Sequence, residues 1–517
     1  MSERIPSYVL GSWHYAATDG VCVRNAVTGE EVGRVSSDGI DAAAVLRYAR
    51  ELGGPALRGL SFHQRADLLK RLAAYLTERK AQTYALSTCM GATRADSLID
   101  VDGGITVLFV YASKGRKEMP DASFLIDGDI EKLSRGGNFV GQHVFTSLRG
   151  ASIQINAYNF PVWQFLQKLA TAVLAGVPTI VKPATPSGYI TALAMRQVVE
   201  SGILPEGAVQ LISGGIGDLF EHLDGQDQIS FTGSANTAAR LRSHPCVTSR
   251  SVRFNAEADS LNCSILGPDA ATGSPEFSLF AEQLTTEMVA KAGQKCTAIR
   301  RAFVPRPMLD AVCEAVSARL AEVVVGNPAR DDVTMGPLVS LEQREEVRQA
   351  VKQLASVARI VSGDPERVDP VDADPSRGAF LSPILLVADS ASDEVPHTVE
   401  PFGPVSTIIP YEDADQAISL AARGQGSLAG SIVTHDAAFA RTVLFGLAPW
   451  HGRILVLDRD DAPESTGHGS PLPHLVHGGP GRAGGGEEMG GIRGVLRHMQ
   501  RTAVQASPAM LSAVTAS

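Results

Sequence analysis

Short apolar segments alternate with stretches of helical periodicity between residues 151 and 231, and this alternation constrains the fold more than any other feature. Consecutive strands joined through a helix run parallel, and a parallel sheet carries helices on both faces. Ligands of such sheets bind at the carboxyl ends of the strands. The expected strands lie at 151–157, 178–182, 208–212 and 228–231.

Helical periodicity also precedes this unit, and a second α/β unit follows it. The earlier helices are expected over 41–50, 61–79 and 84–111, and a charged, turn-rich stretch over 114–120. The second unit begins near residue 263 and again alternates strands with helices, so the whole chain is predicted to be an α/β protein. Its strand signals lie at 262–266, 360–361, 383–387, 406–410 and 431–433.

Residues 124–155 have a different pattern, which is polar and rich in β-forming residues, with Gly136 and Gly137 at the expected turn. This pattern predicts a β-hairpin that stands away from the compact units. Such a hairpin exposes unpaired backbone groups along its edges, so we expect it to pair with another strand or another chain.

The length and net charge of the chain limit the number of domains and the classes of partner that we expect. A chain of 517 residues is expected to form several domains. Its net charge of −10 and pI near 5.7 argue against nucleic acid or an anionic membrane as a partner. The most apolar run, 170–181, is too short to span a bilayer, and the N-terminus lacks the pattern of a secretory or transit signal. We therefore expect a cytoplasmic protein.

The six cysteines occur without a C-x-x-C pair or a His/Cys ligand spacing, which predicts reduced thiols and no metal site. Cys296 differs from the others because it lies in the stretch Lys291-Ala-Gly-Gln-Lys-Cys296-Thr, beside glycine and lysine. A nearby cation or backbone N–H groups would lower the pKa of such a thiol and form the nucleophilic thiolate. The alternative is a small buried apolar residue, as most free cysteines are.

Two other stretches carry groups that thiol chemistry on a carbonyl needs. Asn159, just past a strand end, offers an amide that could hold an oxyanion together with the backbone N–H of Cys296. Glu257 offers a carboxylate that could activate water to release an acid from a thioester, once hydride has passed to an oxidised nicotinamide. Taken singly, Asn159 could be a turn residue and Glu257 a solvated carboxylate. Their joint occurrence favours the catalytic interpretation.

Further residues are placed to meet a dinucleotide. Thr232, Gly233 and Ser234 follow a strand and open a helix, whose N–H groups suit a phosphate. A glycine-rich turn that includes Gly215 follows another strand. Lys182 could reach ribose or phosphate oxygens, or it could be a solvated strand end. The stretch Glu400-Pro-Phe402-Gly-Pro could be only a turn, or it could place a carboxylate on ribose hydroxyls and a ring against the nicotinamide.

Taken together, these residues resemble the aldehyde dehydrogenase superfamily over essentially the whole chain. The order and spacing of the matches are more specific than any one motif. The matches are Asn159-Phe-Pro161, Lys168, Lys182-Pro183, Phe231-Thr-Gly-Ser234, Glu257, Gly293-Gln-Lys-Cys296, Gly336-Pro337 and Glu400-Pro-Phe402-Gly403-Pro404.

The resemblance implies a role for each matched residue. Cys296 would be the nucleophile, Glu257 the general base, Asn159 the oxyanion donor and Lys168 a further polar member of the site. The implied dinucleotide-binding residues are Lys182, Thr185, Gly215, Thr232, Gly233, Ser234, Glu400 and Phe402.

The resemblance also implies an architecture. A Rossmann-like dinucleotide-binding domain would comprise 1–123 and 156–262, and an α/β catalytic domain 263–470. A β arm for oligomerisation and bridging would comprise 124–155 and 471–517. Relatives are dimers or tetramers joined through such an arm and a C-terminal strand like 502–506, so we expect a homodimer.

Three departures from the family pattern affect the cofactor side. Asp259-Ser260 replaces the usual Gly-Gly, and Ala238 replaces a glycine. Thr185 stands where NAD-preferring relatives often carry a glutamate, which binds the ribose hydroxyls and would repel a 2′-phosphate. A neutral threonine near Lys182 admits that phosphate, so NADP is the first expectation and NAD the second.

Other positions resemble the branch that oxidises semialdehydes of ring-opened aromatic CoA thioesters. These are Tyr158, where the family commonly has tryptophan, the stretch 256–262, and 477–488, which begins with His477. A CoA-linked aldehyde is therefore expected, with Tyr158 and His477 as substrate contacts and 478–491 at the substrate entrance or, alternatively, as a mobile loop. A dehydrogenase of simple aliphatic semialdehydes, a CoA-acylating enzyme and a non-catalytic protein on this fold are the alternatives.

Overall fold

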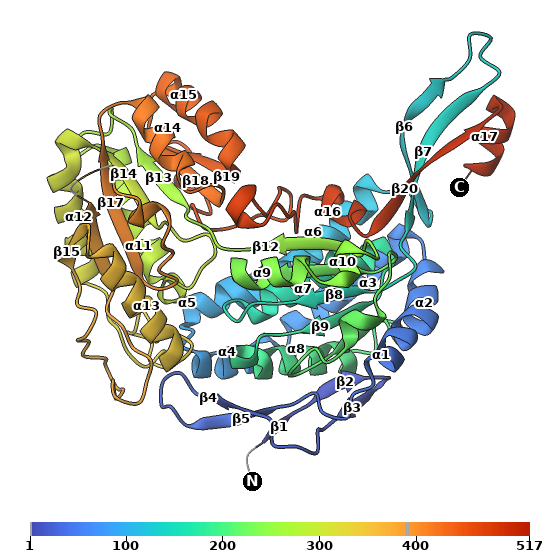
Figure 1. Cartoon of the computed structure of the whole chain (residues 1–517), viewed down its shortest axis with the longest axis horizontal. Helices are drawn as coiled ribbons and strands as arrows, with labels where there is room; N and C mark the ends of the chain where they lie inside the picture. The colour runs from blue at the N-terminus through green and yellow to red at the C-terminus, as the bar shows by residue number, and fades with distance from the viewer. Residues whose placement is uncertain (1–2, 389, 391, 517) are drawn as a thin grey trace.

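The computed structural model describes residues 3–388, 390 and 392–516. The predicted dinucleotide-binding domain includes residues 1–2, the predicted catalytic domain residues 389 and 391, and the predicted arm residue 517, and these five positions lie outside the described residues. The described residues form two large sheets with covering helices, a small N-terminal sheet and a projecting β arm (Figure 1). The small sheet has the order β1-β5-β4. Its strands are β1 Arg4–Ile5, β4 Val21–Arg24 and β5 Glu31–Val35.

The first large sheet has the order β12-β11-β8-β9-β10-β2-β3. Its members from β12 to β10 are parallel, as the alternation predicted, and β2 joins them antiparallel. Because the parallel strands point the same way, their carboxyl ends form one edge of the sheet. The strands are β2 Ser7–Val9, β3 Ser12–His14, β8 Ser152–Ile155, β9 Thr179–Lys182, β10 Val209–Leu211, β11 Gln228–Thr232 and β12 Arg253–Glu257.

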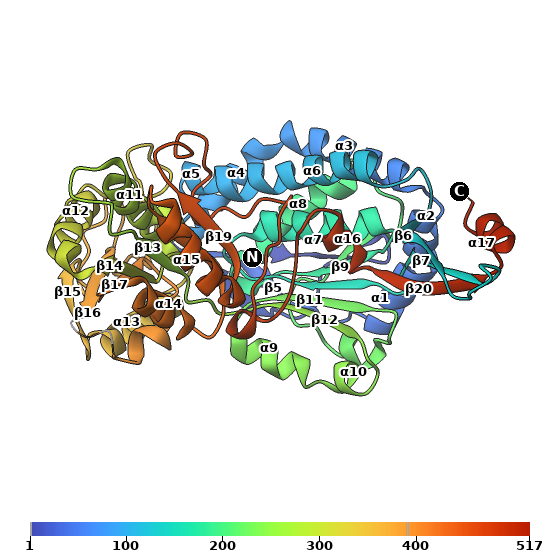
Figure 2. The same cartoon turned by 90° about the horizontal axis from the view of Figure 1, so that it is seen from above.

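Helices cover both faces of this sheet, and Figure 2 shows them above and below it. One core contains residues of α3, α6, α7 and α8, and the other contains residues of α1 and α9 together with Cys246 of α10. The helices are α1 Ala42–Tyr48, α2 Gly54–Arg58, α3 Phe62–Thr77, α7 Pro161–Ala175, α8 Gly188–Glu200, α9 Ala235–Arg242 and α10 Pro245–Thr248.

The helix expected over 84–111 is broken once, into α4 Lys80–Ser87 and a second helix in which α5 Arg94–Ser97 continues through the π-helical turn Leu98–Asp102 into α6 Gly103–Glu118. The break occurs at Gly91, which has a left-handed φ of 87°, and Thr93 then caps α5. The stretch 114–120, expected to be turn-rich, mostly belongs to the last turns of α6. There Lys114 pairs with Glu118 one helical turn away at 2.7 Å, so the charges stabilise the helix.

The second large sheet has the order β15-β16-β17-β14-β13-β18-β19, with α11 and α12 in one core and α13, α14 and α15 in the other. Strands β14 and β19 were not among the expected strands. Arg301 begins β14 and is fully buried, which hides the strand from a search for apolar runs; the carbonyl oxygens of Leu261, Leu420 and Ala421 accept its guanidinium hydrogens. The elements are β13 Cys263–Leu266, β14 Arg301–Pro305, β15 Ala358–Ser362, β16 Ile384–Ala388, β17 Val405–Tyr411, β18 Ser427–Val433, β19 His451–Leu457, α11 Pro275–Val289, α12 Leu309–Ala321, α13 Leu341–Leu354, α14 Ala414–Ala422 and α15 Ala437–Leu447.

The arm consists of β6 Phe124–Lys132, β7 Val140–Ser147 and β20 Met499–Ala506, and it stands away from the two large units (Figure 1). The range 124–155 expected for the arm is too long, because β8 lies in the first large sheet, where Ser152, Ile153 and Gln154 are all buried. The short helices α16 Ile492–Leu496 and α17 Pro508–Val514 flank β20. None of the described helices has the length and apolar character needed to cross a membrane.

Candidate active site

A tight turn after α11 places Cys296. Lys291, Ala292 and Gly293 have φ values of 57°, 50° and 66°, in the left-handed region that L side chains rarely adopt. A Cβ at Gly293 would lie 2.0 Å from the carbonyl oxygen of Gly403, so glycine is required for this close approach. The Asn262 amide then donates to the carbonyl oxygen of Cys296 at 2.8 Å and fixes the residue's position.

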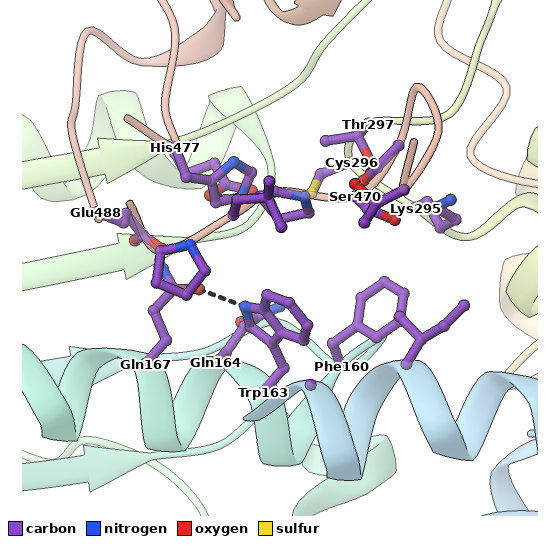
Figure 3. Close-up of a pocket in the computed structure, with 18 of the residues that line it drawn as sticks. Phe160, Trp163, Gln164, Gln167, Lys295, Cys296, Thr297, Ser470, His477 and Glu488 are labelled. Carbon is purple, nitrogen blue, oxygen red and sulfur yellow. Dashed lines mark hydrogen bonds and ion pairs between the residues drawn. The ribbon is translucent and has the colours of Figure 1, made fainter. Parts of the chain in front are cut away.

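Two cavities meet at Cys296, and both are also lined by Glu257. The smaller, of about 260 Å³, is hereafter the inner cavity, and Phe160 and Trp163 of the α7 region form apolar walls in it (Figure 3). Leu472, in the C-terminal segment 471–498, adds to this apolar lining. The larger, of about 590 Å³, lies at the carboxyl ends of the parallel strands and is hereafter the strand-end cavity. The thiol can therefore be approached from two sides.

Glu257 ends β12 and pairs with His477. One carboxylate oxygen, Oε2, lies 3.0 Å from His477 Nε2, and both side chains are almost completely buried. Burial raises the pKa of the Glu257 carboxyl, but the charge and hydrogen bond of His477 outweigh burial and bring the pKa below its ordinary value. The carboxylate is therefore ionised near neutral pH, and its lowered pKa means that it holds a proton only transiently.

The electrostatics of Cys296 differ from the sequence expectation of a lowered pKa. Burial, followed by the negative charge of Glu257, raises the pKa of the thiol well above its ordinary value. The flanking lysines do not supply the expected cation: Lys295 Nζ donates to Glu287 at 2.9 Å, and Lys291 lies over the ring of Phe160. The thiol is consequently protonated until a base takes its proton, and Glu257 is the neighbouring base.

Asn159 is buried and held at both ends of its amide. Its Nδ2 donates to the carbonyl oxygen of Gln294 at 3.0 Å, and its Oδ1 accepts from Gln164 Nε2 at 2.9 Å. Because an amide nitrogen carries two hydrogens, one donor remains for another acceptor. Asn159 and Cys296 both line the strand-end cavity. When the sulfur attacks a carbonyl carbon, the carbonyl oxygen becomes an oxyanion, and the fixed Nδ2 of Asn159 could donate a hydrogen bond to it.

Behind these residues lies a buried polar cluster around Lys168. Its Nζ donates to Asn156 Oδ1 at 2.9 Å and to Thr232 Oγ1 at 2.7 Å, and it lies 3.4 Å from Glu488 Oε1. Burial raises the pKa of Glu488. Gln167 Nε2 donates to Glu488 Oε2 at 2.8 Å, so the cluster extends to the wall of the inner cavity.

The strand-end cavity collects most of the residues expected to bind a dinucleotide. Its lining includes Lys182, Thr232, Gly233, Ser234, Glu400 and Phe402. Glu400 Oε1 is buried and has no hydrogen-bond partner among the described residues. Burial raises the pKa of Glu400 to about 7, so this carboxyl can either donate to or accept from a hydroxyl group. An orphaned carboxyl in a polar cavity at strand ends fits the ribose of a nicotinamide dinucleotide.

The replacement of Gly-Gly by Asp259-Ser260 has a visible consequence. The Ala235 N–H, in the first turn of α9, donates to Asp259 Oδ1 at 2.7 Å, and the Thr237 N–H donates to Ser234 Oγ at 3.3 Å. Side chains thus already occupy two donors that were expected to meet a phosphate. Arg482, from the C-terminal segment, lies 3.9 Å from Asp259 and lines the same cavity.

Three predicted residues lie elsewhere than expected. The described residues that line the strand-end cavity include neither Thr185 nor Gly215. Thr185 lines a separate cavity of about 640 Å³, and a Cβ at Gly215 would lie 3.5 Å from Ser37 Oγ. Tyr158, expected on the substrate side, instead lines the strand-end cavity, where its ring meets that of Phe402 edge-on at 6.1 Å.

Several residues of the inner cavity were missed in the sequence. Phe160, Trp163, Gln164 and Gln167 follow the spacing of one helical face, and this face of the α7 region lines the cavity. That spacing could have indicated a common face, but α7 is buried on all sides, so its sequence does not distinguish a face that lines a cavity from a face that packs in the core. Glu488 had no local signal, because its contacts come from helix α7 and strand β11, far away in the chain.

Comparisons with known proteins agree with this arrangement. Residues 13–449 match the model of the aldehyde dehydrogenase family, and the chain therefore belongs to that family. The expected fold and the expected class of enzyme, an NAD(P)-dependent oxidoreductase of aldehydes, are thereby confirmed.

The chain is 44% identical to 3,4-dehydroadipyl-CoA semialdehyde dehydrogenase of Aromatoleum evansii, over 92% of this chain and 93% of that protein. It is 27% identical to the non-phosphorylating aspartate-semialdehyde dehydrogenase of Halomonas elongata, over 93% and 92% of the two chains. The structure of betaine aldehyde dehydrogenase from Staphylococcus aureus in complex with NAD+ has the same fold. It superposes with a TM-score of 0.83 at 22% identity and covers 98% of this chain and 95% of that one.

Proposed function

We propose that this enzyme oxidises an aldehyde to a carboxylic acid through a thioester on Cys296. The observation that carries the proposal is the meeting of Cys296 and Glu257 at the junction of two cavities, with Asn159 beside them. The aldehyde would enter the inner cavity and the dinucleotide the strand-end cavity. A bound oxidised nicotinamide supplies the acceptor for hydride.

In the first half of the proposed reaction, Glu257 takes the thiol proton, and the sulfur attacks the aldehyde carbon. Asn159 donates to the resulting oxyanion. Collapse of the adduct expels hydride and leaves a thioester. Glu257 then releases the thiol proton to solvent and is ionised again. In the second half, Glu257 removes a proton from water as the water attacks the thioester carbon; the carbon–sulfur bond breaks, the carboxylic acid leaves, and Glu257 gives this proton to the sulfur. His477 holds the carboxylate of Glu257 in position for both steps.

The proposed substrate is 3,4-dehydroadipyl-CoA semialdehyde, oxidised to 3,4-dehydroadipyl-CoA during aerobic benzoate degradation. Identity to the Aromatoleum protein along nearly the whole chain supports it. The inner cavity supports it as well, because about 260 Å³ lies below the usual range of roughly 300–1,000 Å³ for drug-sized ligands. Its apolar walls suit an acyl chain, while the much larger CoA portion would remain outside.

Two other reactions use the same thiol. A hydrolytic enzyme for simple aliphatic semialdehydes would also fill the inner cavity. A CoA-acylating enzyme would pass the thioester to free CoA instead of water. The ionised Glu257 carboxylate at the thiol favours water.

We further propose NADP as the cofactor with NAD second, a homodimer, and a cytoplasmic location. A neutral Thr185 in place of a carboxylate supports NADP. The long exposed arm formed by β6, β7 and β20 supports the dimer. The six free cysteines are compatible with a reducing compartment.

A substrate screen tests these proposals together. Aliphatic semialdehydes, each free and as its CoA thioester, are incubated with the enzyme and with NADP+ or NAD+, and the reduced nicotinamide is followed by absorbance. We expect the highest kcat/KM for a CoA-linked semialdehyde with NADP+. Equal efficiency with free semialdehydes would contradict the substrate, a requirement for added CoA would favour the acylating reaction, and no reduction of either cofactor would contradict the function.

A further inference from the structure

Three side chains around the thiol form a set of metal ligands. The ligand atoms of Glu257, Cys296 and His477 all lie within 4.8 Å of one another, although they come from three distant parts of the chain. Thiolate, imidazole and carboxylate are the ligands that Zn²⁺ prefers in proteins. We propose that Glu257, Cys296 and His477 form an inhibitory binding site for a thiophilic divalent cation such as Zn²⁺.

The distances require little rearrangement. With metal–ligand distances of about 2.0 Å for nitrogen and oxygen and about 2.3 Å for sulfur, neighbouring ligands of a tetrahedral ion lie about 3.3 to 3.5 Å apart. The Glu257–His477 pair, at 3.0 Å, would open slightly, and each remaining separation, which is at most 4.8 Å, would close by no more than about 1.3 to 1.5 Å. Small side-chain rotations achieve both changes.

The charges around the cluster also favour a cation. Glu257 and Glu488 are buried carboxylates, and binding of a metal would add the thiolate of Cys296. Lys168, which lies 3.4 Å from Glu488, supplies one positive charge beside them. His477, whose charge acts on Glu257, must give up a proton to bind an ion. A divalent ion would balance the excess of buried negative charge.

The inner cavity provides access and a free coordination position. Glu257, Cys296 and His477 line it together, so an ion can reach all three side chains. Figure 3 shows Cys296 and His477 on the same side of the cavity. Three protein ligands leave the fourth position of a tetrahedral ion for water, as in open zinc sites. Since the ion would hold the sulfur that must attack the aldehyde, binding is expected to compete with aldehyde.

A second group of ligands serves as a control. His435, Asp458 and Asp460 also lie close enough to hold an ion, but they are exposed or half-buried and lie apart from both cavities. Solvent competes for such ligands, and the group lacks a thiol. His435→Asn therefore removes a histidine ligand from the surface without touching the proposed site.

The test is a titration of the full chain with Co²⁺, which reports thiolate ligation through a charge-transfer absorption band, followed by displacement of the Co²⁺ with Zn²⁺. Neither substrate nor dinucleotide is added, so the outcome does not depend on the proposed reaction. We expect the band in the unaltered protein and in His435→Asn, and no band in Cys296→Ala. His477→Asn and Glu257→Gln should each weaken Co²⁺ binding by at least about tenfold. Thermal unfolding of each variant checks that it is folded.

Inhibition provides the second measurement. Zn²⁺ should raise the apparent KM for aldehyde, and a chelator should restore activity. The proposal is overturned if no thiolate band forms, if the band persists unchanged in folded His477→Asn and Glu257→Gln, or if inhibition by Zn²⁺ disappears in His435→Asn.

Discussion

The two cavities at Cys296 are built in different ways. The strand-end cavity takes much of its lining from the carboxyl ends of parallel strands, including Lys182, and the loop before β17 adds Glu400. The inner cavity takes its lining from one helical face and an irregular C-terminal segment, with apolar groups such as Trp163 and Leu472. In the reaction we propose, the sheet edge would therefore supply polar groups to the dinucleotide, whereas the irregular segment would determine the shape of the space for the aldehyde.

Removal of the Cys296 sulfur, which lines both cavities, should have the largest effect: it should abolish turnover without weakening dinucleotide binding. Cys296→Ala is expected to lower kcat on the order of 10⁴-fold or more, because Cys296 is the only thiol among the described residues that line the two cavities. Dinucleotide affinity, measured by fluorescence titration, should remain within about twofold of the original value, since an alanine leaves the strand-end cavity open. Retention of steady turnover would contradict the role of the sulfur.

Glu257 also faces both cavities, but it should matter most after hydride transfer. Glu257→Gln is expected to lower kcat by about 10²- to 10⁴-fold. Rapid mixing should show one burst of reduced nicotinamide, slower than in the unaltered enzyme because Glu257 no longer takes the thiol proton, but still present because the charge that, after burial, raises the pKa of the thiol is also gone. A stall should follow, and mass spectrometry should detect the thioester on Cys296. Steady turnover equal to that of the unaltered enzyme would rule out this residue as the base.

The pair of Glu257 and His477 predicts a change in pH dependence. His477→Asn removes the main group that lowers the pKa of Glu257, so burial then raises that pKa. A carboxylate acts as a base only above its pKa, and the acid limb of the kcat profile should move to higher pH. We expect kcat near pH 6 to fall roughly tenfold more than kcat near pH 8. An unshifted acid limb would show that His477 does not control the base.

The inner cavity can be changed by itself. Trp163→Ala removes an aromatic wall and the hydrogen bond from its indole nitrogen to Gln167 Oε1 at 2.6 Å. The KM for aldehyde should rise about tenfold, equivalent to about 1.4 kcal/mol, while the KM for dinucleotide stays constant. Trp163→Phe keeps an aromatic wall and serves as the matched control. Equal increases in both KM values would show that the cavities are not independent.

The smallest expected effect concerns cofactor choice. Thr185→Glu adds a carboxylate just after the strand that carries Lys182, and it should shift the ratio of kcat/KM values severalfold toward NAD. The effect is limited because Thr185 lines a neighbouring cavity rather than the strand-end cavity. Steady-state kinetics with both cofactors measures the shift, and an unchanged ratio would remove the argument for NADP.

The same contrast explains what the sequence could predict. Alternating strands and helices bring strand ends together, so Lys182 and Ser234 could be placed at one edge from their positions alone, whereas only the structure shows that Glu257 ends β12 at the same edge. Local patterns could not place Glu488 or pair Glu257 with His477, because these contacts join distant segments. Nor could they show that the lysines beside Cys296 are engaged elsewhere, since side-chain direction depends on the packed turn.

Segment 471–498 connects the second large unit to β20, whose residues pair along their whole length with β7. At its other end, Arg453 donates to the backbone oxygens of His468 and Ser470. A chain held at both ends has fewer conformations than one with a loose tail. The wall that segment 471–498 gives to the inner cavity is therefore kept rigid by pairing of β20 with β7, although β20 does not line that cavity. We expect removal of β20 to reduce the discrimination between aldehydes before it lowers kcat.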